Sequence, residues 1–389
     1  MKICFIYNSI FTLGGIQRCI SNLSNYFVRN GHEVTVICCD KKINIDRKMY
    51  NLDNRVNIIH VKESFLKSKL MIYRLPLIKI NNRYGLFKNN YSILKNIYFP
   101  FYNNIKSIIK EKNFDVVIGS GVYFNSLLST INTGNKVKIG WQHSSYYFYF
   151  EEEGYKNKDA IANHMFKNLD SYIVLTDDDK KKIKKNWDYE TVRIYNAIDK
   201  IPDQSGKYEN KKFIAAGRLS AEKRFDLLIK NFHAFSKENE DWTLDIYGEG
   251  SEKQYLQNLI DKLNLNNRVK LCGYSSNMNE KYLGSSIYCM TSIGEGFGMT
   301  VVEAMSCGLP IISYGIPSMK EILNDSCSFC VEEGNHREFV DKMLMLTSNK
   351  TTYNYLSKNA KYECKDFAIE NIGNQWLEII DDLIKKKGN

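Results

Sequence analysis

The sequence predicts an α/β protein of two doubly wound domains, each built on a parallel sheet that helices cover on both faces. Apolar runs of strand length alternate with helical patterns along almost all of its 389 residues. These runs are continuously apolar, which is typical of strands buried on both faces. The alternation stops at the polar segment 196–210 and then restarts. Since domains average roughly 150 residues, we expect two facing domains with a cleft between them.

The expected elements follow this alternation. In the first half, strands are expected at 2–7, 33–38, 115–119, 137–141, 171–175 and 191–195. In the second half, they are expected at 213–217, 242–248, 268–273, 287–291 and 311–314, with a helix at 225–235. Residues 367–387 predict one amphipathic helix with no strand after it, which we expect to pack back on the first domain. The expected boundaries are therefore 1–198, 199–366 and a C-terminal helix at 367–389.

The composition excludes several classes of protein. With 43% hydrophobic and 25% charged residues, the chain is not intrinsically disordered. No stretch of about 18 consecutive apolar residues predicts a membrane-spanning helix. The N-terminal run is broken at Asn8 and has no small-residue cleavage site, so it indicates a strand rather than a signal peptide, and we expect a cytoplasmic protein. The ten cysteines do not form a disulfide framework, and we interpret the single C-x-x-C pair, Cys327 and Cys330, as two buried thiols in a strand.

The net charge of +10 is concentrated in one segment. Between Lys62 and Lys112 there are eleven Lys and Arg residues against two acids. The same segment holds nine aromatic residues: Phe65, Tyr73, Tyr84, Phe87, Tyr91, Tyr98, Phe99, Phe101 and Tyr102. Basic residues interleaved with aromatic ones fit an anionic membrane surface or single-stranded nucleic acid, and they also fit a plain solvated helical face. No nucleic-acid module accompanies this insertion, 62–112, so we expect no nucleic-acid partner and keep the other two interpretations open.

The strongest motif is SIGEGFGMTVVEAMSCGLPIISY, residues 292–314. It predicts a glycine-rich turn at 294–298 between a buried strand and a short helix. Glycines let the backbone approach a ligand closely, and a helix N-terminus presents unpaired N–H groups and a positive dipole end, so the turn predicts a phosphate site. Glu295 and Glu303 make poor phosphate ligands, but they are good acceptors for the hydroxyls of a sugar and a ribose.

With seven residues between them, Glu295 and Glu303 resemble the E-x7-E signature of the retaining glycosyltransferases of family 4. The segment AAGRLSAEKRFDLLI resembles the family's diphosphate-binding segment. The turns at 247–250 and Gly273 and the loop at Gly14 and Gly15 follow at the expected places. The resemblance covers nearly the whole chain. It implies the GT-B fold of two facing Rossmann-like domains and the transfer of a sugar from a nucleotide.

The resemblance also implies roles for individual residues. Arg218 and Lys223 would bind the donor diphosphate, and Glu303 would bind the ribose hydroxyls. Two residues would be catalytic: Glu295, which would contact the donor sugar, and His143, in WQHSSYYF after the strand at 137–141, which would be the catalytic His of the first domain. The other expected donor-binding residues are Gly14, Gly15, Gly296, Phe297, Gly298, Met299 and Thr300.

We expect no metal and no cofactor. Residues 177–179 contain the D-x-D pattern with which other glycosyltransferases bind a metal. However, the segment TDDDKKKIKK opens a helix, where acids suit the positive end of the dipole.

We expect a retaining glycosyltransferase that moves a hexose or an N-acetylhexosamine from a nucleotide sugar, UDP-linked by default, to a lipid-linked glycan. The composition, rich in Asn, Lys, Ile and Tyr, indicates a low-GC microbe and therefore a capsule, O-antigen or similar surface polysaccharide, made on the inner face of the membrane. The alternatives are a sugar-nucleotide epimerase of similar architecture, a nicotinamide dehydrogenase, which the lack of G-x-G-x-x-G spacing disfavours, and a non-catalytic membrane-associated binding protein.

Overall fold

The computed structural model describes residues 1–388 except 41–44, 62–64 and 153–156, and it describes the side chains of all these residues except 65–74 and 152. The chain forms two compact units. Unit 1 consists of Met1–Ala197 and Ile369–Asn389, and unit 2 consists of Ile198–Ala368. Within the described residues, no helix is both long enough and apolar enough to cross a membrane.

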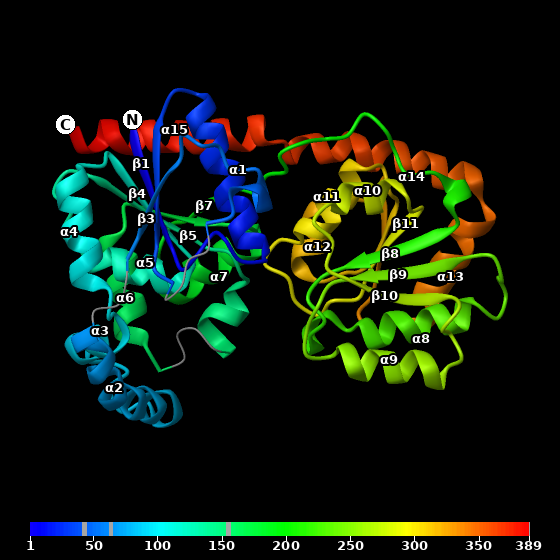
Figure 1. Ribbon diagram of the computed structural model, residues 1–389, viewed down its shortest axis with the longest axis horizontal. Coiled ribbons are helices and arrows are strands. Elements are labelled where there is room, and N and C mark those ends of the chain that lie inside the picture. The colour runs from blue at the N-terminus through cyan, green and yellow to red at the C-terminus, as the bar shows by residue number, and fades with distance from the viewer. Residues whose placement is uncertain (41–44, 62–64, 153–156, 389) are drawn as a thin grey trace. The chain divides into compact units, whose positions relative to one another are not determined.

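Unit 1 contains a seven-stranded parallel sheet in the order β3-β2-β1-β4-β5-β6-β7 (Figure 1). Its strands are β1 (Lys2–Tyr7), β2 (Glu33–Cys38), β3 (Asn57–His60), β4 (Val116–Ser120), β5 (Val137–Trp141), β6 (Ser171–Val174) and β7 (Val192–Arg193). The order reverses between β1 and β4, which pair in parallel with Ile3 opposite Val116. In doubly wound sheets, ligands bind beyond the carboxyl ends of the strands at such a reversal point.

The helices of unit 1 begin and end at the following residues: α1 (Gly15–Arg29), η1 (Arg47–Tyr50), α2 (Phe65–Tyr84), α3 (Tyr91–Tyr98), α4 (Tyr102–Lys112), α5 (Val122–Ser129), η2 (Tyr147–Glu152), α6 (Asp159–Asn168), α7 (Asp177–Trp187) and α15 (Ile369–Gly388). The last of these, α15, packs against α1 at a close approach, because a Cβ on Gly373 would lie 2.3 Å from the ring of Tyr26. Trp376 of α15 also meets Trp141 of β5, with ring centroids 5.0 Å apart.

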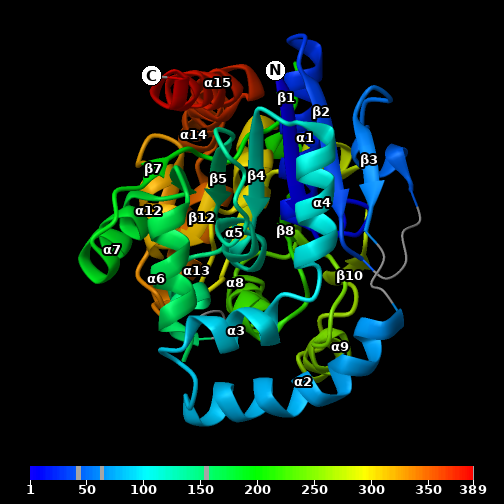
Figure 2. The same ribbon diagram turned by 90° about the vertical axis from the view of Figure 1, so that its left-hand side faces the viewer.

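The basic segment folds as α2, α3 and α4, and α3 lies between α2 and the rest of unit 1 (Figures 1 and 2). Leu94, Ile105 and Ile109 are buried in the core of unit 1. Most of the aromatic residues of the segment belong to this core as well, since Phe99 is buried and Phe87, Tyr98, Phe101 and Tyr102 pack against it. The side chains of Phe65 and Tyr73 lie outside the described part. Tyr84, with 64% exposed, is therefore the described aromatic of this segment that faces solvent most openly.

Unit 2 contains a six-stranded parallel sheet in the order β10-β9-β8-β11-β12-β13. Its strands are β8 (Lys212–Ala216), β9 (Thr243–Tyr247), β10 (Val269–Gly273), β11 (Ile287–Met290), β12 (Ile311–Tyr314) and β13 (Ser328–Val331). Its helices are η3 (Tyr208–Asn210), η4 (Ala221–Lys223), α8 (Phe225–Phe235), α9 (Lys253–Lys262), α10 (Met278–Leu283), α11 (Met299–Ser306), α12 (Pro317–Ile322), α13 (His336–Ser348), α14 (Lys350–Glu363) and η5 (Cys364–Phe367). Here the order reverses between β8 and β11.

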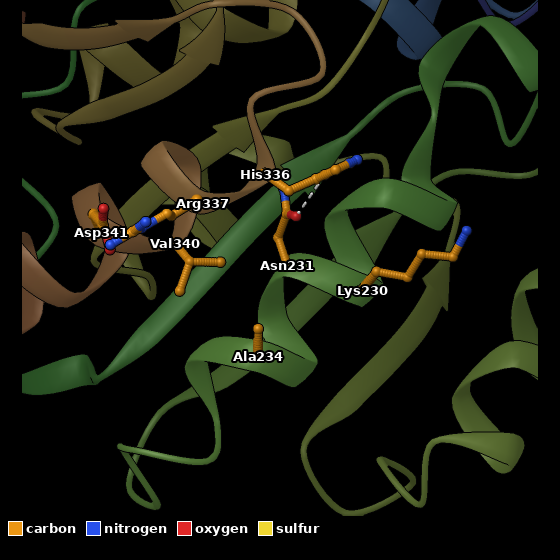
Figure 3. Close-up of a pocket in the computed structure, with 7 residues that line it drawn as sticks. All are labelled: Lys230, Asn231, Ala234, His336, Arg337, Val340 and Asp341. Carbon is orange, nitrogen blue, oxygen red and sulfur yellow. Dashed lines mark hydrogen bonds between the residues drawn. The ribbon is translucent and has the colours of Figure 1, made fainter.

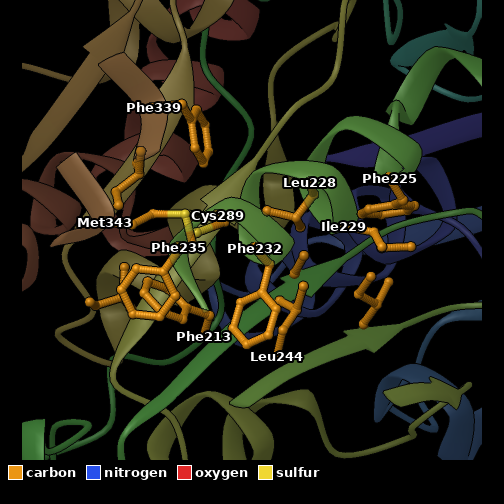
Figure 4. Packing of buried hydrophobic residues seen from close by; sticks show 14 of the residues in the cluster. Phe213, Phe225, Leu228, Ile229, Phe232, Phe235, Leu244, Cys289, Phe339 and Met343 are labelled. Carbon is orange, nitrogen blue, oxygen red and sulfur yellow. The ribbon is translucent and has the colours of Figure 1, made fainter. Parts of the chain in front are cut away.

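A cluster of aromatic rings fixes α8 on the sheet of unit 2. Phe213 of β8 lies edge-on to Phe235 of α8, with ring centroids 5.1 Å apart, and Phe232 lies beside both (Figure 4). All three rings are fully buried. Because α8 directly follows the loop 217–224, this packing anchors the C-terminal end of that loop, which carries Arg218 and Lys223.

The predicted fold class is confirmed, since both units are parallel α/β sheets with helices on their faces. The expected strands all form within a few residues of the expected positions, although 191–195 shortens to the two residues of β7. The sequence analysis missed β3, whose four residues, NIIH, are no more than half buried.

Candidate functional site

The centre of the site in unit 2 is an ion pair at the point where the strand order reverses. Lys223, after β8, donates a hydrogen bond to Glu295 Oε1, after β11, at 2.5 Å. The side chains are only 18% and 15% exposed. Since β8 and β11 are neighbours in the sheet, both loops leave the same carboxyl edge. The structure thus brings together two residues that the sequence assigns to donor binding.

Three further contacts join the loop after β8 to the loop after β11. The hydroxyl of Thr291 donates to the carbonyls of Lys223 and Arg224, at 3.2 and 2.9 Å. The N–H of Ile293 donates to the carbonyl of Glu222 at 3.0 Å. Because the backbones are tied together on both sides of Lys223, its ammonium group is held beside Glu295 by more than the ion pair alone.

Ser292 orients the carboxylate of Glu295. Its hydroxyl donates to Glu295 Oε1 at 2.9 Å, and Ser292 itself is only 2% exposed. Lys223 and Ser292 both bond to the same oxygen, Oε1, so neither of them occupies Oε2. A fixed carboxylate with an oxygen left over is suited to accept a hydrogen bond from a sugar hydroxyl.

The glycine-rich turn leads into α11. Gly298 has φ +98°, and a Cβ there would lie 2.4 Å from Met319 Cε, so the position requires glycine. No side chain among the described residues caps the N-terminus of α11, and its first turn contains no acid. Thr300 in that turn is held by Tyr288 of β11, whose hydroxyl lies 2.7 Å from Thr300 Oγ1. The backbone N–H groups of Met299 and Thr300 therefore start the helix without a capping acceptor from a side chain.

The other predicted donor residues of unit 2 differ in accessibility. Glu303 faces inward from the second turn of α11 and is 7% exposed. Phe297 is also buried, and its ring packs against Phe367 with centroids 5.6 Å apart, so its observed role is packing. Gly296 is half buried, whereas Arg218 is exposed at the end of β8.

His143 lies in unit 1 directly after Gln142, which follows β5. Neither ring nitrogen has a hydrogen-bond partner among the described residues, although both are buried. Burial lowers the pKa of His143 to about 3, so the imidazole is neutral at physiological pH. The ring lies 4.1 Å from that of Trp141, which holds one of its faces. A neutral imidazole has one donor and one acceptor nitrogen, and here both are free for a ligand.

Gly14 and Gly15 lie in the loop between β1 and α1. The N–H of Gly14 donates to the hydroxyl of Tyr50 at 2.9 Å, and that hydroxyl lies 3.0 Å from the carbonyl of Thr12. No side chain of the described residues caps α1, which begins at Gly15. The glycine loop is therefore a second helix N-terminus at a carboxyl strand edge, in a different unit from Lys223 and Glu295.

The acids at 177–179 begin α7, as the sequence analysis expected from their charge. Asp177 pairs with Arg193 at 3.3 Å, and Asp178 pairs with Lys182 at 2.7 Å. Among the residues that the structure describes, no group of three or more His, Cys, Asp or Glu side chains could hold a metal ion. Cys327 is buried and Cys330 half buried, and both are free thiols.

A pocket of about 360 Å³ lies elsewhere in unit 2, between α8 and α13 (Figure 3). Its lining includes Asn231 and His336, whose side chains bond to each other at 3.0 Å. The His336 ring nitrogen also lies 3.3 Å from the hydroxyl of Tyr314. The pocket shares no residue with the predicted donor site, and these polar groups are satisfied within the protein.

Comparison with known proteins identifies the chain. Residues 197–363 match the family model of the glycosyl transferases group 1, and residues 13–200 match that of Glycosyltransferase Family 4. The chain belongs to the glycosyltransferases. The two matches meet at residues 197–200, where unit 1 passes into unit 2, so each unit of the glycosyltransferase corresponds to one of them, except for Ile369–Asn389 of unit 1, which lies in neither match.

Relatives agree with this assignment over most of the chain. The glycosyltransferase is 27% identical to an uncharacterized glycosyltransferase of Haemophilus influenzae, over 97% of this chain and 99% of that one. It is 24% identical to the poly(ribitol-phosphate) α-N-acetylglucosaminyltransferase of Staphylococcus aureus, over 88% of this chain and 70% of that one. The crystal structure of S. aureus TarM with Fondaparinux, α-GlcNAc-glycerol and UDP superposes with a TM-score of 0.79 at 19% identity, covering 97% and 99% of the two chains. The glycosyltransferase therefore has the GT-B fold.

Sequence analysis missed Thr291, Ser292 and Tyr288. The two hydroxyl residues directly follow β11, so their place at the carboxyl edge could have been noted, but their partners are set by the approach of two distant loops. Nothing in the sequence indicates that the hydroxyl of Tyr288, inside a buried strand, reaches Thr300.

Proposed function

We propose that this glycosyltransferase transfers N-acetylglucosamine from UDP-N-acetylglucosamine to a glycan acceptor, with retention of the anomeric configuration. The observation that carries the proposal is the ion pair of Lys223 and Glu295 at the reversal point of the sheet in unit 2. Glu295 belongs to the loop that leads to the start of α11, which no described side chain caps. A cation, a helix N-terminus and a fixed carboxylate supply the three kinds of contact that a nucleotide sugar needs.

The donor diphosphate would bind to Arg218, Lys223 and the first N–H groups of α11. Charge develops on the leaving diphosphate as the bond to the sugar breaks, and preorganised cations and N–H donors stabilise that charge. Glu303 would accept hydrogen bonds from the ribose hydroxyls and Glu295 from the donor sugar. In this arrangement a diphosphate competes with Glu295 for Lys223, so donor binding would release the carboxylate toward the sugar.

Retention would follow from attack on the face that the leaving group occupies. The bond from the anomeric carbon to the phosphate oxygen breaks, the bond to the acceptor oxygen forms, and the acceptor proton passes to the departing phosphate. His143, neutral and with both ring nitrogens unsatisfied among the described residues, would bond to a hydroxyl of the reacting sugar. No carboxylate nucleophile is then required.

The relatives favour N-acetylglucosamine among the possible donor sugars. One relative is named an α-N-acetylglucosaminyltransferase acting on poly(ribitol-phosphate), and a similar structure contains UDP and α-GlcNAc-glycerol. Because that relative is named for a polymeric acceptor, we extend the proposal to a polymeric acceptor for this enzyme. The family assignment favours a transferase over the epimerase and the non-catalytic binding protein.

The test is a donor screen. The purified protein is incubated with a set of UDP-hexoses and UDP-N-acetylhexosamines and with lipid-linked glycan acceptors, and products are identified by mass spectrometry. We expect transfer from UDP-N-acetylglucosamine and, by NMR, an α-linked product. A β-linked product would overturn retention, transfer only from another UDP-sugar would overturn the choice of donor, and isomerised donor without transfer would overturn the transfer reaction itself.

We further propose that the enzyme works on the inner face of a membrane. The surface that binds the membrane would be α2 and the segment after it, up to Ile93. Leu75, Leu77, Ile80, Tyr84, Leu86 and Ile93 are between 36% and 66% exposed. Lys79, Arg83 and Lys88 are exposed among them. Exposed aliphatic side chains mixed with cations fit the headgroup region of an anionic bilayer better than they fit a plain solvated face.

The position of this patch suits a lipid-linked acceptor. The segment that follows β3 leads to α2, so α2 comes after the carboxyl end of a strand of the unit 1 sheet. Figure 2 shows α2 and α3 beyond the same edge of the sheet from which α5 leaves β4. His143 also follows the carboxyl end of a strand, so the patch and the histidine lie toward the same edge of unit 1.

A further inference from the structure

One carboxylate holds the loop that carries His143 from both sides. Asp179, in the first turn of α7, accepts a hydrogen bond from Gln142 Nε2 at 2.9 Å and from the N–H of Tyr146 at 2.7 Å. Gln142 immediately precedes His143, and Tyr146 follows it three residues later. The N–H of Asp179 itself donates to Thr176 Oγ1 at 3.1 Å, which fixes the start of the helix.

Asp179 is unlike the two acids before it. Asp177 and Asp178 form ion pairs near the surface, whereas Asp179 is 2% exposed. A buried carboxylate is costly unless hydrogen bonds satisfy it, and here both oxygens accept one. Both bonds come from the loop that carries His143, so the contacts that satisfy the buried carboxylate also fix that loop.

The carboxylate also decides which way the Gln142 amide faces. An ionised carboxylate only accepts hydrogen bonds, so Gln142 must present Nε2 to it and turn Oε1 away. Gln142 Oε1 and both ring nitrogens of His143 are buried and have no partner within the part of the chain that the structure describes. Buried polar atoms are normally satisfied, so three unsatisfied ones on adjacent residues indicate a place for ligand hydroxyls.

We propose that Asp179 is a positioning residue of the transfer reaction, which fixes the 142–146 loop and turns the Gln142 amide so that its Oε1 and the His143 ring face the sugar. This inference rests on the proposed function for its kinetic consequence. We call the two hydrogen bonds that Asp179 accepts from Gln142 and Tyr146 the clamp. The clamp is present in the protein without substrate, so the experiment below measures the clamp and its kinetic consequence separately.

The clamp is sensitive to protonation of Asp179. Burial raises the pKa of this carboxyl to about 6. The charged and titratable groups around it are Asp178, Lys182, Glu151, Tyr149 and Tyr172. Burial raises the pKa of both tyrosines and lowers that of His143 to about 3, so the tyrosines and His143 keep their protonation state near pH 6. A protonated Asp179 can donate, and the Gln142 amide is then no longer forced to face it with Nε2.

The test compares three variants. Asp179→Ala removes both contacts, and Asp179→Asn keeps an acceptor for Tyr146 but offers an N–H₂ group to Gln142, as the protonated carboxyl offers O–H. Asp178→Asn is the control, since it changes the same charge one residue earlier. The measurements are kcat and donor KM from pH 5 to 8, and amide hydrogen exchange at Tyr146 without substrate.

For Asp179→Ala we expect kcat to fall by about 10- to 100-fold, the scale of a misplaced catalytic contact, with donor KM changed by less than about threefold. Exchange at Tyr146 should be at least about tenfold faster. Asp179→Asn should keep the amide protected and show a lowered kcat that no longer changes near pH 6, whereas the wild-type kcat falls to the level of this variant below that pH. Asp178→Asn should match the wild type.

Either of two results with Asp179→Ala would overturn the proposal. If the amide of Tyr146 exchanges as slowly in Asp179→Ala as in the wild type, Asp179 does not hold the loop, whether or not the enzyme is active. If the Tyr146 amide exchanges faster in Asp179→Ala but kcat is unchanged, Asp179 holds the loop without contributing to catalysis. If Asp179→Ala does not fold, Asp179→Asn still decides, since an unchanged inflection near pH 6 in that variant contradicts the role of the carboxylate. A wild type that transfers no sugar would instead count against the proposed function.

Discussion

Lys223 and Glu295 are 72 residues apart in the sequence, yet Lys223 Nζ lies 2.5 Å from Glu295 Oε1. The contact spans the two strands between which the sheet order of unit 2 reverses. Both residues belong to the predicted donor site, and in this structure the cation and the carboxylate neutralise each other. This arrangement makes the two side chains interdependent in stability as well as in binding.

The first prediction concerns that interdependence. In a double-mutant cycle with Lys223→Ala and Glu295→Ala, we expect a coupling energy of about 1–3 kcal/mol in the free energy of unfolding, because the pair is largely buried. Urea denaturation measures it. The control is the exposed pair of Lys253 and Glu249, for which we expect about 0.5 kcal/mol or less. A coupling no larger than that of the control would show that the two side chains do not depend on each other.

The second prediction separates the two glutamates in kinetics. Under the proposed function Glu303 accepts hydrogen bonds from the ribose, so Glu303→Ala should mainly raise donor KM. Glu295→Ala should also lower kcat, since a contact to the sugar that tightens in the transition state contributes to turnover. Steady-state kinetics with Glu280→Ala, an exposed position on α10, as the control measures both constants. Near wild-type values for both variants would contradict the assignment.

The third prediction is that transfer does not require a divalent cation. Arg218, Lys223 and the start of α11 are expected to stabilise the leaving diphosphate without one. Activity should be unchanged after dialysis against EDTA, with metal-free buffers throughout. Loss of activity on chelation that manganese restores would mean that the donor diphosphate is bound in another way.

The fourth prediction concerns the exposed patch of α2 and the segment after it. Wild-type protein should float with anionic vesicles at low salt, and the charge reversals Lys79→Glu, Arg83→Glu and Lys88→Glu should release it, since each cation contributes about 1 kcal/mol near such a surface. Reversal of three exposed lysines of unit 2, Lys237, Lys253 and Lys262, changes the net charge equally and should leave flotation intact. Wild-type protein that stays at the bottom of the gradient would end the membrane proposal.

The fifth prediction is that Asp179→Asn stabilises the protein at pH 7.5. Burial raises the pKa of Asp179 from 3.8 to about 6, so between these values the folded protein binds more protons than the unfolded chain, and stability falls as pH rises through this range. At pH 7.5 the ionised form costs up to about 3 kcal/mol, which an amide avoids. Thermal unfolding from pH 4 to 8 measures this. A variant less stable than the wild type at pH 7.5 would contradict the expected sign.

Sequence patterning predicted most of the fold, because strands buried on both faces leave continuous apolar runs. It failed at β3, where an edge strand of four residues buries too little to leave such a run. It also overestimated the aromatic content of the basic surface. Phe99 and Tyr102 fit a membrane-binding pattern in the sequence, but they lie in or against the core, and aliphatic residues such as Leu86 face solvent instead.

The site was predictable only as far as its position along the chain. The alternation places Lys223 and Glu295 after predicted strands, but it shows neither that these two strands are neighbours nor that the two side chains form an ion pair. Acids at 177–179 predicted a helix start, yet the turn that sends Asp179 inward and its neighbours outward depends on how α7 packs. Phe297 shares the glycine-rich motif with its neighbours, and the structure buries it against Phe367.

The return of α15 to unit 1 affects how the protein is made. During synthesis Met1–Ala197 leaves the ribosome before α15 does, so Trp141 lacks its neighbour Trp376 until α15 emerges. Unit 2 is continuous in the chain, so it is complete in the nascent protein while unit 1 still exposes the apolar surface that α15 covers. Unit 1, whose first 197 residues precede unit 2 in the chain, is therefore completed after unit 2, and it depends on an intact α15.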